Sequence, residues 1–142
     1  MKNKKVIAAG VLAIAKSTGR ILLGKRASRH QEGNCWCIFG GTFDKKDGFP
    51  KTTAYREFFE ETGVELTNIS SEPIYVQETN WVQYSTYVSF FPSEFEPTMN
   101  EEHTDYGWFD LESLELANIH PGMIEMFENE IVYNKIKKLT NG

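Results

Sequence analysis

The chain contains 142 residues, 40% of them hydrophobic, with a formal net charge of −5. We expect a single domain over residues 1–142 with enough apolar content for a buried core. The acidic balance excludes passive attraction of phosphates and argues against duplex DNA as a partner. Two cysteines, Cys35 and Cys37, are too few for a disulfide framework or a zinc site, which favours packing roles and a reducing, cytoplasmic location.

The N-terminal pattern predicts a strand over residues 6–16, a turn over residues 17–20 and a second strand over residues 20–26. A lysine-rich start before an apolar run is also the outline of a secretory signal, but the turn and the strand after it favour a strand. The apolar run is too short to span a membrane. We therefore expect a protein without a membrane-spanning segment.

A polar loop over residues 27–34 follows the second strand, and positive side chains gather around it. They are Lys25, Arg26, Arg29 and His30. This cluster is a candidate site for a phosphate-bearing substrate, with Arg26 and Arg29 as the predicted substrate-binding residues. An ordinary solvated loop explains the same residues equally well, so the sequence leaves both interpretations open.

A strand over residues 36–39 leads into Gly40 and Gly41, and a helix is predicted to begin at Pro50 and to end before Gly63. Proline at the start and glycine past the end are typical of helix boundaries. With about 100° between successive residues, the helix has an apolar face and an acidic one. The apolar face comprises Tyr55, Phe58, Phe59 and Thr62. The acidic face comprises Glu57, Glu60 and Glu61, with Arg56 beside it.

The acidic face of this helix has two explanations. Like charges four residues apart, at Glu57 and Glu61, destabilise a helix by about 0.2–0.5 kcal/mol. Acidic groups in the last turn also oppose the helix dipole, at about 0.3–1 kcal/mol each. Solvent tolerates such a surface, so an exposed acidic face is the first explanation. A site for a hard divalent cation is the second, because Mg²⁺ prefers carboxylate oxygens together with substrate phosphates.

The rest of the chain interleaves strands with helices. We expect strands over residues 74–78, 83–91 and 107–109, a brief helix over residues 111–116 and a C-terminal helix over residues 121–139. These elements predict an α+β fold in which a central mixed β-sheet lies between helices as an α/β/α sandwich.

The segment from Gly41 to Val64 resembles the signature of the Nudix hydrolase family, G-x5-E-x7-R-E-U-x-E-E-x-G-U, in which U is a bulky apolar residue. The second half matches from Arg56 onward. In the first half, the Glu position falls on Gly48 when counted back from Arg56 and on Asp47 when counted forward from Gly41. One inserted residue reconciles the two counts, so either Asp47 replaces the missing Glu or nothing does. The resemblance implies the same sandwich fold.

The resemblance also implies roles for individual residues. Glu57, Glu60 and Glu61 would bind a divalent metal, Mg²⁺ or alternatively Mn²⁺, together with the backbone carbonyl of Gly40. Arg56 would orient the carboxylates. Metal ions neutralise phosphate charge and activate water for in-line attack. Crowded carboxylates raise each other's proton affinity, which makes Glu57 our preferred proton acceptor and keeps Glu60 as a catalytic candidate.

Two predicted site residues lie outside the motif. Glu102 precedes a histidine and an aromatic strand, as in many Nudix proteins, so we expect this acid to face the metals; a plain surface loop is the alternative. Trp81 lies near a turn and is predicted to stack on a nucleobase, whereas Tyr84 and Tyr87 are expected to pack within the sheet.

The resemblance implies a divalent-metal-dependent hydrolase that splits a pyrophosphate bond in a nucleoside diphosphate linked to another moiety. Its partner would be a small-molecule nucleotide of unspecified identity, and a homodimer is compatible with the sequence. The alternative is a catalytically impaired Nudix-fold module that senses a nucleotide, an idea motivated by the altered motif. The intact glutamates favour the enzyme, and no feature supports an isomerase of the same fold.

Overall fold

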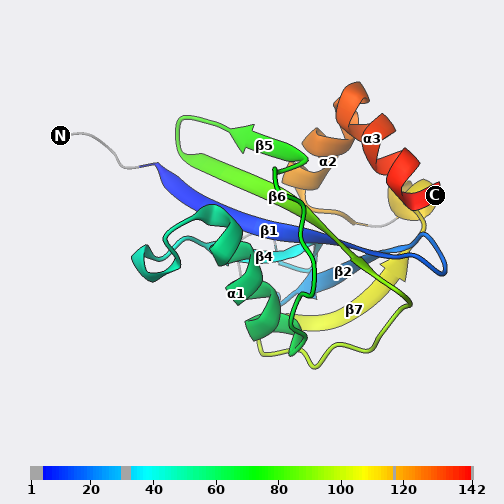
Figure 1. Ribbon diagram of the computed structural model, residues 1–142, viewed down its shortest axis with the longest axis horizontal. Coiled ribbons are helices and arrows are strands. Elements are labelled where there is room, and N and C mark those ends of the chain that lie inside the picture. Colours follow the sequence, from blue (N-terminus) through cyan, green and yellow to red (C-terminus); the bar gives the residue numbers. More distant parts are fainter. Residues whose placement is uncertain (1–4, 30–32, 117, 142) are drawn as a thin grey trace.

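A mixed seven-stranded sheet forms the middle layer of the computed structural model (Figure 1). Its strands are β1 (Val6–Ala15), β2 (Ile21–Arg26), β3 (Trp36–Cys37), β4 (Phe39–Thr42), β5 (Tyr75–Glu78), β6 (Val82–Phe91) and β7 (His103–Phe109). β1 pairs in parallel with β6 and antiparallel with β2 and β4. The strand order is β3-β2-β1-β6-β5, with β7 beside β2. The structure describes residues 5–29, 33–116 and 118–141, so His30 of the predicted basic cluster lies outside the described residues.

Helices cover both faces of this sheet (Figure 1). They are the 3₁₀ helix η1 (Lys45–Asp47), α1 (Pro50–Thr62), the 3₁₀ helix η2 (Leu111–Leu116), α2 (Pro121–Glu128) and α3 (Glu130–Asn141). Side chains along β1 alternate between two cores, as the two-residue period of a strand requires. Leu12 joins Met123 and Ile136 of the C-terminal helices, whereas Val11 joins Phe58 of α1. The predicted α+β sandwich with a mixed sheet is therefore confirmed.

Most predicted elements agree with the structure to within a residue at each end, but three differ. The strand expected over residues 36–39 is two short strands, because β3 pairs with β2 whereas β4 moves across to β1. β7 begins earlier than predicted, at His103, because its pairing with β2 continues through polar residues that hide the strand pattern. The single helix expected over residues 121–139 is interrupted at Asn129, whose Oδ1 accepts a hydrogen bond from the N–H of Val132 and caps α3.

The face of α1 that meets the sheet differs from the predicted one. Phe58 and Thr62 are buried as expected, but Tyr55 and Phe59 are 38% and 49% exposed. Glu61, expected on the opposite face, is only 5% exposed. Small side chains make up much of the buried face of α1, which consists of Thr53, Ala54, Phe58, Glu61 and Thr62, so one of the predicted acidic residues belongs to this face.

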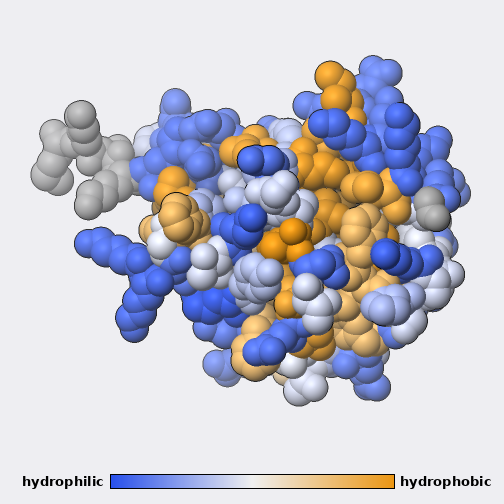
Figure 2. Space-filling view, viewed as in Figure 1, coloured by the Kyte–Doolittle hydropathy of each residue, from blue (hydrophilic) through white to orange (hydrophobic). Residues whose placement is uncertain are grey.

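Apolar side chains also reach the surface beside the C-terminal helices. Figure 2 shows them gathered beside α3, while hydrophilic side chains cover most of the remaining outline. Ile124 and Ile131 are 42% and 70% exposed. A second copy of the chain would cover such a surface, and the homodimer stays a prediction. No helix in the described part of the chain combines the length and apolar character needed to cross a membrane.

Candidate active site

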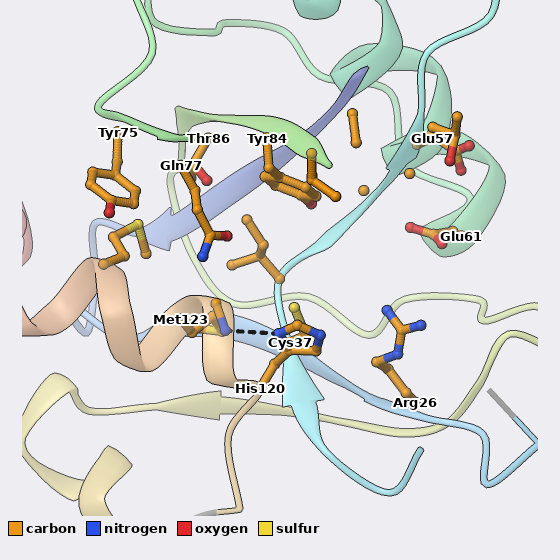
Figure 3. Close-up of a pocket in the computed structure, with 18 of the residues that line it drawn as sticks. Arg26, Cys37, Glu57, Glu61, Tyr75, Gln77, Tyr84, Thr86, His120 and Met123 are labelled. Carbon is orange, nitrogen blue, oxygen red and sulfur yellow. Dashed lines mark hydrogen bonds between the residues drawn. The ribbon is translucent and has the colours of Figure 1, made fainter. Parts of the chain in front are cut away.

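A cavity of about 580 Å³ extends from α1, past the Gly40-Gly41 segment of β4, to the first turns of α2. Figure 3 shows Glu57 and Glu61 at one end of this cavity and Tyr75 and Met123 at the other. The cavity therefore joins a charged end to an end built from aromatic, amide and thioether side chains.

Three carboxylates line the charged end: Glu57, Glu61 and Glu102. α1 supplies the first two, four residues apart, and the loop before β7 supplies the third. A Cβ atom at Gly41 would lie only 2.4 Å from Cδ of Glu57. The carboxylate of Glu57 therefore lies against bare backbone, and the glycines of β4 allow α1 to bring its acids to this edge.

Glu61 is a buried acid without full hydrogen bonding. Its side-chain Oε1 has no hydrogen-bond partner among the described residues. Burial first, and then the charge of Glu57, raise the pKa of Glu61 to about 9, against the opposing effect of a backbone hydrogen bond from Gly40. Burial also raises the pKa of Glu57. An unpaired buried carboxylate is costly unless a cation or a proton compensates its charge.

We expect Gly41→Ala to reduce any hydrolytic turnover roughly tenfold to a hundredfold, because the new methyl group would displace the Glu57 carboxylate. The melting temperature should change little, since the displaced atoms are the mobile end of a side chain and the backbone of Gly41 is outside the left-handed region. Turnover and thermal unfolding of the same preparation test this prediction. A variant that keeps full turnover would contradict the assigned position of Glu57.

Asp47 is a buried partner of Arg56. Its two carboxylate oxygens accept hydrogen bonds from Nε and Nη2 of Arg56, at 2.8 and 3.0 Å, and Oδ2 also accepts one from Oγ1 of Thr53 at 2.8 Å. The side chain of Asp47 is only 3% exposed. Hydrogen bonding to the Arg56 guanidinium holds the pKa of Asp47 well below its usual range. The bidentate geometry makes this one of the stronger kinds of ion pair.

Arg56 connects Asp47 to the acidic face of α1. Its Nη1 lies 3.3 Å from Oε1 of Glu57 and 3.2 Å from Oε1 of Glu60, and its Nη2 donates to the carbonyl of Thr42 at 3.1 Å. Arg56 itself does not line the cavity. Arg56 thus contacts both glutamates, and its orienting role stays a prediction.

The donor set fits a hard cation, although the described residues contain no complete cluster of three His, Cys, Asp or Glu side chains arranged to hold a metal ion. Glu57 and Glu61 line the cavity with Gly40. The side chain of Glu60 is 49% exposed, pairs with Arg56 and does not line the cavity. The unpartnered oxygen of Glu61 is the observation that favours a cation at this end.

The loop that carries Glu102 is tied to both α1 and the loop after β2. The backbone N–H of Glu102 donates to Oδ1 of Asn100 at 2.9 Å, and Nδ2 of Asn100 donates to the carbonyl of Glu60 at 3.1 Å. Nη2 of Arg29 donates to the carbonyl of Glu101 at 2.7 Å. These bonds hold Glu102 at the lining of the cavity, and its expected position facing a metal stays a prediction.

The predicted substrate-binding residues occupy three different positions. Arg26 lines the charged end of the cavity, and its buried Nε has no hydrogen-bond partner among the described residues. Arg29 lies three residues further along the chain and donates to the backbone carbonyl of Glu101 instead. Trp81 is 63% exposed and lies outside the cavity lining. The structure therefore brings only Arg26 together with the carboxylates.

Sequence reasoning missed the other end of the cavity. The residues that form this end and the middle of the cavity include Tyr75, Gln77, Tyr84, Thr86, His120 and Met123. Alternation along β5 and β6 places four of them on one face, but it does not reveal that α2 leaves this part of the face uncovered. Tyr84, expected to pack within the sheet, lines the cavity. His120 caps α2, since its Nδ1 accepts the N–H of Gly122 at 3.0 Å, and Figure 3 draws this bond as a dashed line.

Cys37 also lines the cavity but is unsuited to nucleophilic chemistry. Burial raises the pKa of its thiol to about 12, so the thiol stays protonated near neutral pH. The packing role expected for Cys37 agrees with this environment.

Residues 4–129 match the model of the NUDIX domain family, and this match covers most of the chain. The chain therefore belongs to the Nudix family. No curated protein matches the sequence.

Solved structures support the same fold. The NUDIX domain of Shewanella oneidensis NrtR, complexed with ADP ribose, has a TM-score of 0.74 and 18% identity over 89% of this chain and 86% of that one. A MutT protein from Methanosarcina mazei Go1 has a TM-score of 0.71 and 22% identity over 95% and 99% of the two chains. A bifunctional NMN adenylyltransferase/ADP ribose pyrophosphatase from Francisella tularensis, complexed with AMP and a Mn ion, has a TM-score of 0.66 and 19% identity; 89% of this chain covers 42% of that one.

Proposed function

We propose that this chain is a divalent-metal-dependent hydrolase that splits a pyrophosphate bond in a nucleoside diphosphate linked to another moiety. The observation that carries the proposal is the buried Glu61 carboxylate, whose Oε1 lacks a hydrogen-bond partner among the described residues and which shares the cavity with Glu57 and Glu102. Three carboxylates at one end of a cavity would repel a diphosphate unless cations neutralised them.

Glu57, Glu61 and the backbone carbonyl of Gly40 would hold the metal ion, Mg²⁺ or Mn²⁺, with Glu60 adjacent in the motif. Bound there, a divalent cation would neutralise phosphate charge and polarise a water molecule. Arg56, anchored by Asp47, keeps Glu57 in position. Glu102 lines the same end of the cavity, and with Glu57 it is our candidate to accept the proton of the attacking water. Arg26 would pair with a phosphoryl oxygen.

Asp47 supports the enzyme over the nucleotide-sensing alternative. The sensor hypothesis rests on the missing Glu in the first half of the motif. Asp47 is placed where one inserted residue predicts that acid, and it forms a buried bidentate pair with Arg56. We propose that Asp47 takes the place of the motif Glu and that the altered spacing reflects the short η1 helix that presents it.

ADP-ribose is the first substrate to test, because one structural relative is complexed with ADP ribose and another is an ADP ribose pyrophosphatase. The end of the cavity lined by Gln77 and Tyr75 would receive the nucleoside or the linked group. Stacking on Trp81 would require movement of its turn, since its side chain lies outside the lining. The free thiols of Cys35 and Cys37 fit a cytoplasmic location.

Incubation with a panel of ADP-ribose, nucleotide sugars, dinucleoside polyphosphates and nucleoside triphosphates tests the proposal. We expect at least one member to be cleaved at its pyrophosphate bond in the presence of Mg²⁺ or Mn²⁺, with a nucleotide or phosphate product resolved by chromatography. Chelation with EDTA should abolish the reaction. Tight nucleotide binding without turnover of any panel member would instead favour the sensor.

A further inference from the structure

Tyr84 is positioned by two glycines on neighbouring strands. It pairs with Ala8 across the parallel β1–β6 ladder, and its side chain extends over β1 toward β4. A Cβ atom at Gly10 would lie 2.2 Å from the Tyr84 hydroxyl oxygen, and one at Gly40 would lie 2.3 Å from it. Gly10 and Gly40 are register partners, so together they form one bare patch of backbone beneath the hydroxyl. The position of this hydroxyl therefore requires glycine on both strands.

The hydroxyl of Tyr84 lies between the two ends of the cavity. Figure 3 shows the ring between Gln77 on one side and Glu61 on the other. The phenol of Tyr84 carries an O–H donor at this position. No hydrogen bond joins it to another described residue. The hydroxyl of Tyr75 differs, because it donates to Oε2 of Glu125 at 2.8 Å.

Packing alone does not account for this arrangement. A phenylalanine ring would fill the same space over β1 without an oxygen pressed against Gly10 and Gly40. The hydroxyl of Tyr84 lines a cavity, where it could donate a hydrogen bond to an oxygen-rich ligand. Phosphoryl oxygens are strong hydrogen-bond acceptors. The three carboxylates at the charged end of the cavity offer them no donor when ionised, so a nearby hydroxyl is valuable.

We propose that Tyr84 is a substrate-binding residue whose hydroxyl donates a hydrogen bond to a phosphoryl oxygen of a diphosphate that crosses the middle of the cavity. The inference rests on the proposed function, since it assigns one contact of that same site. It predicts that the protein distinguishes ligands by the phosphoryl group at this position rather than by the nucleoside alone.

Tyr84→Phe tests the inference, with Tyr87→Phe as its matched control. Tyr87 lies on the same strand but joins the α1-side core, on the face away from the cavity. We expect Tyr84→Phe to weaken calorimetric binding of α,β-methylene-ADP with Mg²⁺ and to lower kcat/KM, each roughly tenfold to a hundredfold. Binding of adenosine should be unchanged in both variants. Thermal unfolding should show that both remain folded, because each retains its ring.

The outcomes separate the two proposals. If the wild type hydrolyses a panel substrate and Tyr84→Phe matches Tyr87→Phe in binding and turnover, the Tyr84 contact is wrong and the hydrolase proposal stands. An equal loss of adenosine and α,β-methylene-ADP binding would also overturn it, because the hydroxyl would then act on the nucleoside or on the cavity shape. If the wild type cleaves no substrate, selective loss of α,β-methylene-ADP binding would still support the contact while the hydrolase proposal fails.

Discussion

Replacing Glu61 with glutamine should lower turnover roughly a hundredfold or more while making the metal-free protein more stable. The loss of turnover follows from removing a charged oxygen ligand from the site proposed for the cation. The gain in stability follows from removing a buried carboxylate whose Oε1 has no hydrogen-bond partner among the described residues. Few substitutions in an enzyme combine these two effects, so together they identify a functional acid rather than a structural one.

The stability gain should depend on pH in a defined direction. The pKa of Glu61 in the folded chain, about 9, is above its usual value, so the folded state holds this proton more tightly than the unfolded state. The metal-free wild type should therefore lose stability as the pH rises from about 4.5 toward 9, relative to Glu61→Gln. Near pH 7.5 the difference in unfolding free energy should be about 4 kcal/mol, because each pH unit above 4.5 costs the wild type about 1.4 kcal/mol.

Denaturant unfolding in EDTA across this pH range measures the effect. Adding Mg²⁺ should stabilise the wild type and leave Glu61→Gln nearly unchanged, because a ligand that binds only the folded state raises stability. Parallel stability curves for the two proteins, with equal responses to Mg²⁺, would contradict the role of Glu61.

Replacing Asp47 with alanine should destabilise the protein by about 2–3 kcal/mol and lower turnover roughly tenfold to a hundredfold. The substitution removes acceptors from Arg56 and Thr53 in a buried position. Arg56 then loses the anchor that holds it against Glu57 and Glu60. Urea unfolding and steady-state kinetics on the same preparation measure the two losses.

Asp47→Asn is the control for charge, because it keeps the shape of the side chain. The pKa of Asp47 is lowered in the folded protein, so its stabilising effect is fully present above its usual value near 3.8 and is lost as the pH falls further. The stability difference between wild type and Asp47→Asn should therefore shrink at acid pH. Full turnover in Asp47→Ala would show that Asp47 does not replace the motif Glu.

The sequence was sufficient to predict the sandwich fold and the carboxylates on α1, because both depend on local patterns. Alternation along strands, proline before α1 and Gly63 after it are local signals, and the motif joins them. The identity of the buried acid was not predictable in this way. A helical wheel places Glu61 opposite the apolar residues, but the small side chains of α1 let a different face approach the sheet, which buries Glu61 and exposes Phe59.

The cavity residues beyond the motif depend on contacts between distant segments. In the sequence, nothing distinguishes Tyr84 from an ordinary strand residue. The pairing of β1 with both β4 and β6 is what brings its side chain over Gly10 and Gly40. Trp81 was predicted from its place near a turn, yet the sequence does not specify the direction in which that turn points. Arg29 similarly donates to a backbone carbonyl far away in sequence, which no pattern in its own loop indicates.

A crystal structure with Mn²⁺ and a non-hydrolysable ADP-ribose analogue would test the central claim most directly. Anomalous scattering would locate the metal without reference to activity. We expect at least one Mn²⁺ ion bound by Glu57 and Glu61 and in contact with a phosphoryl oxygen of the analogue. A nucleotide seated in the cavity with no anomalous signal beside these two glutamates would contradict the account.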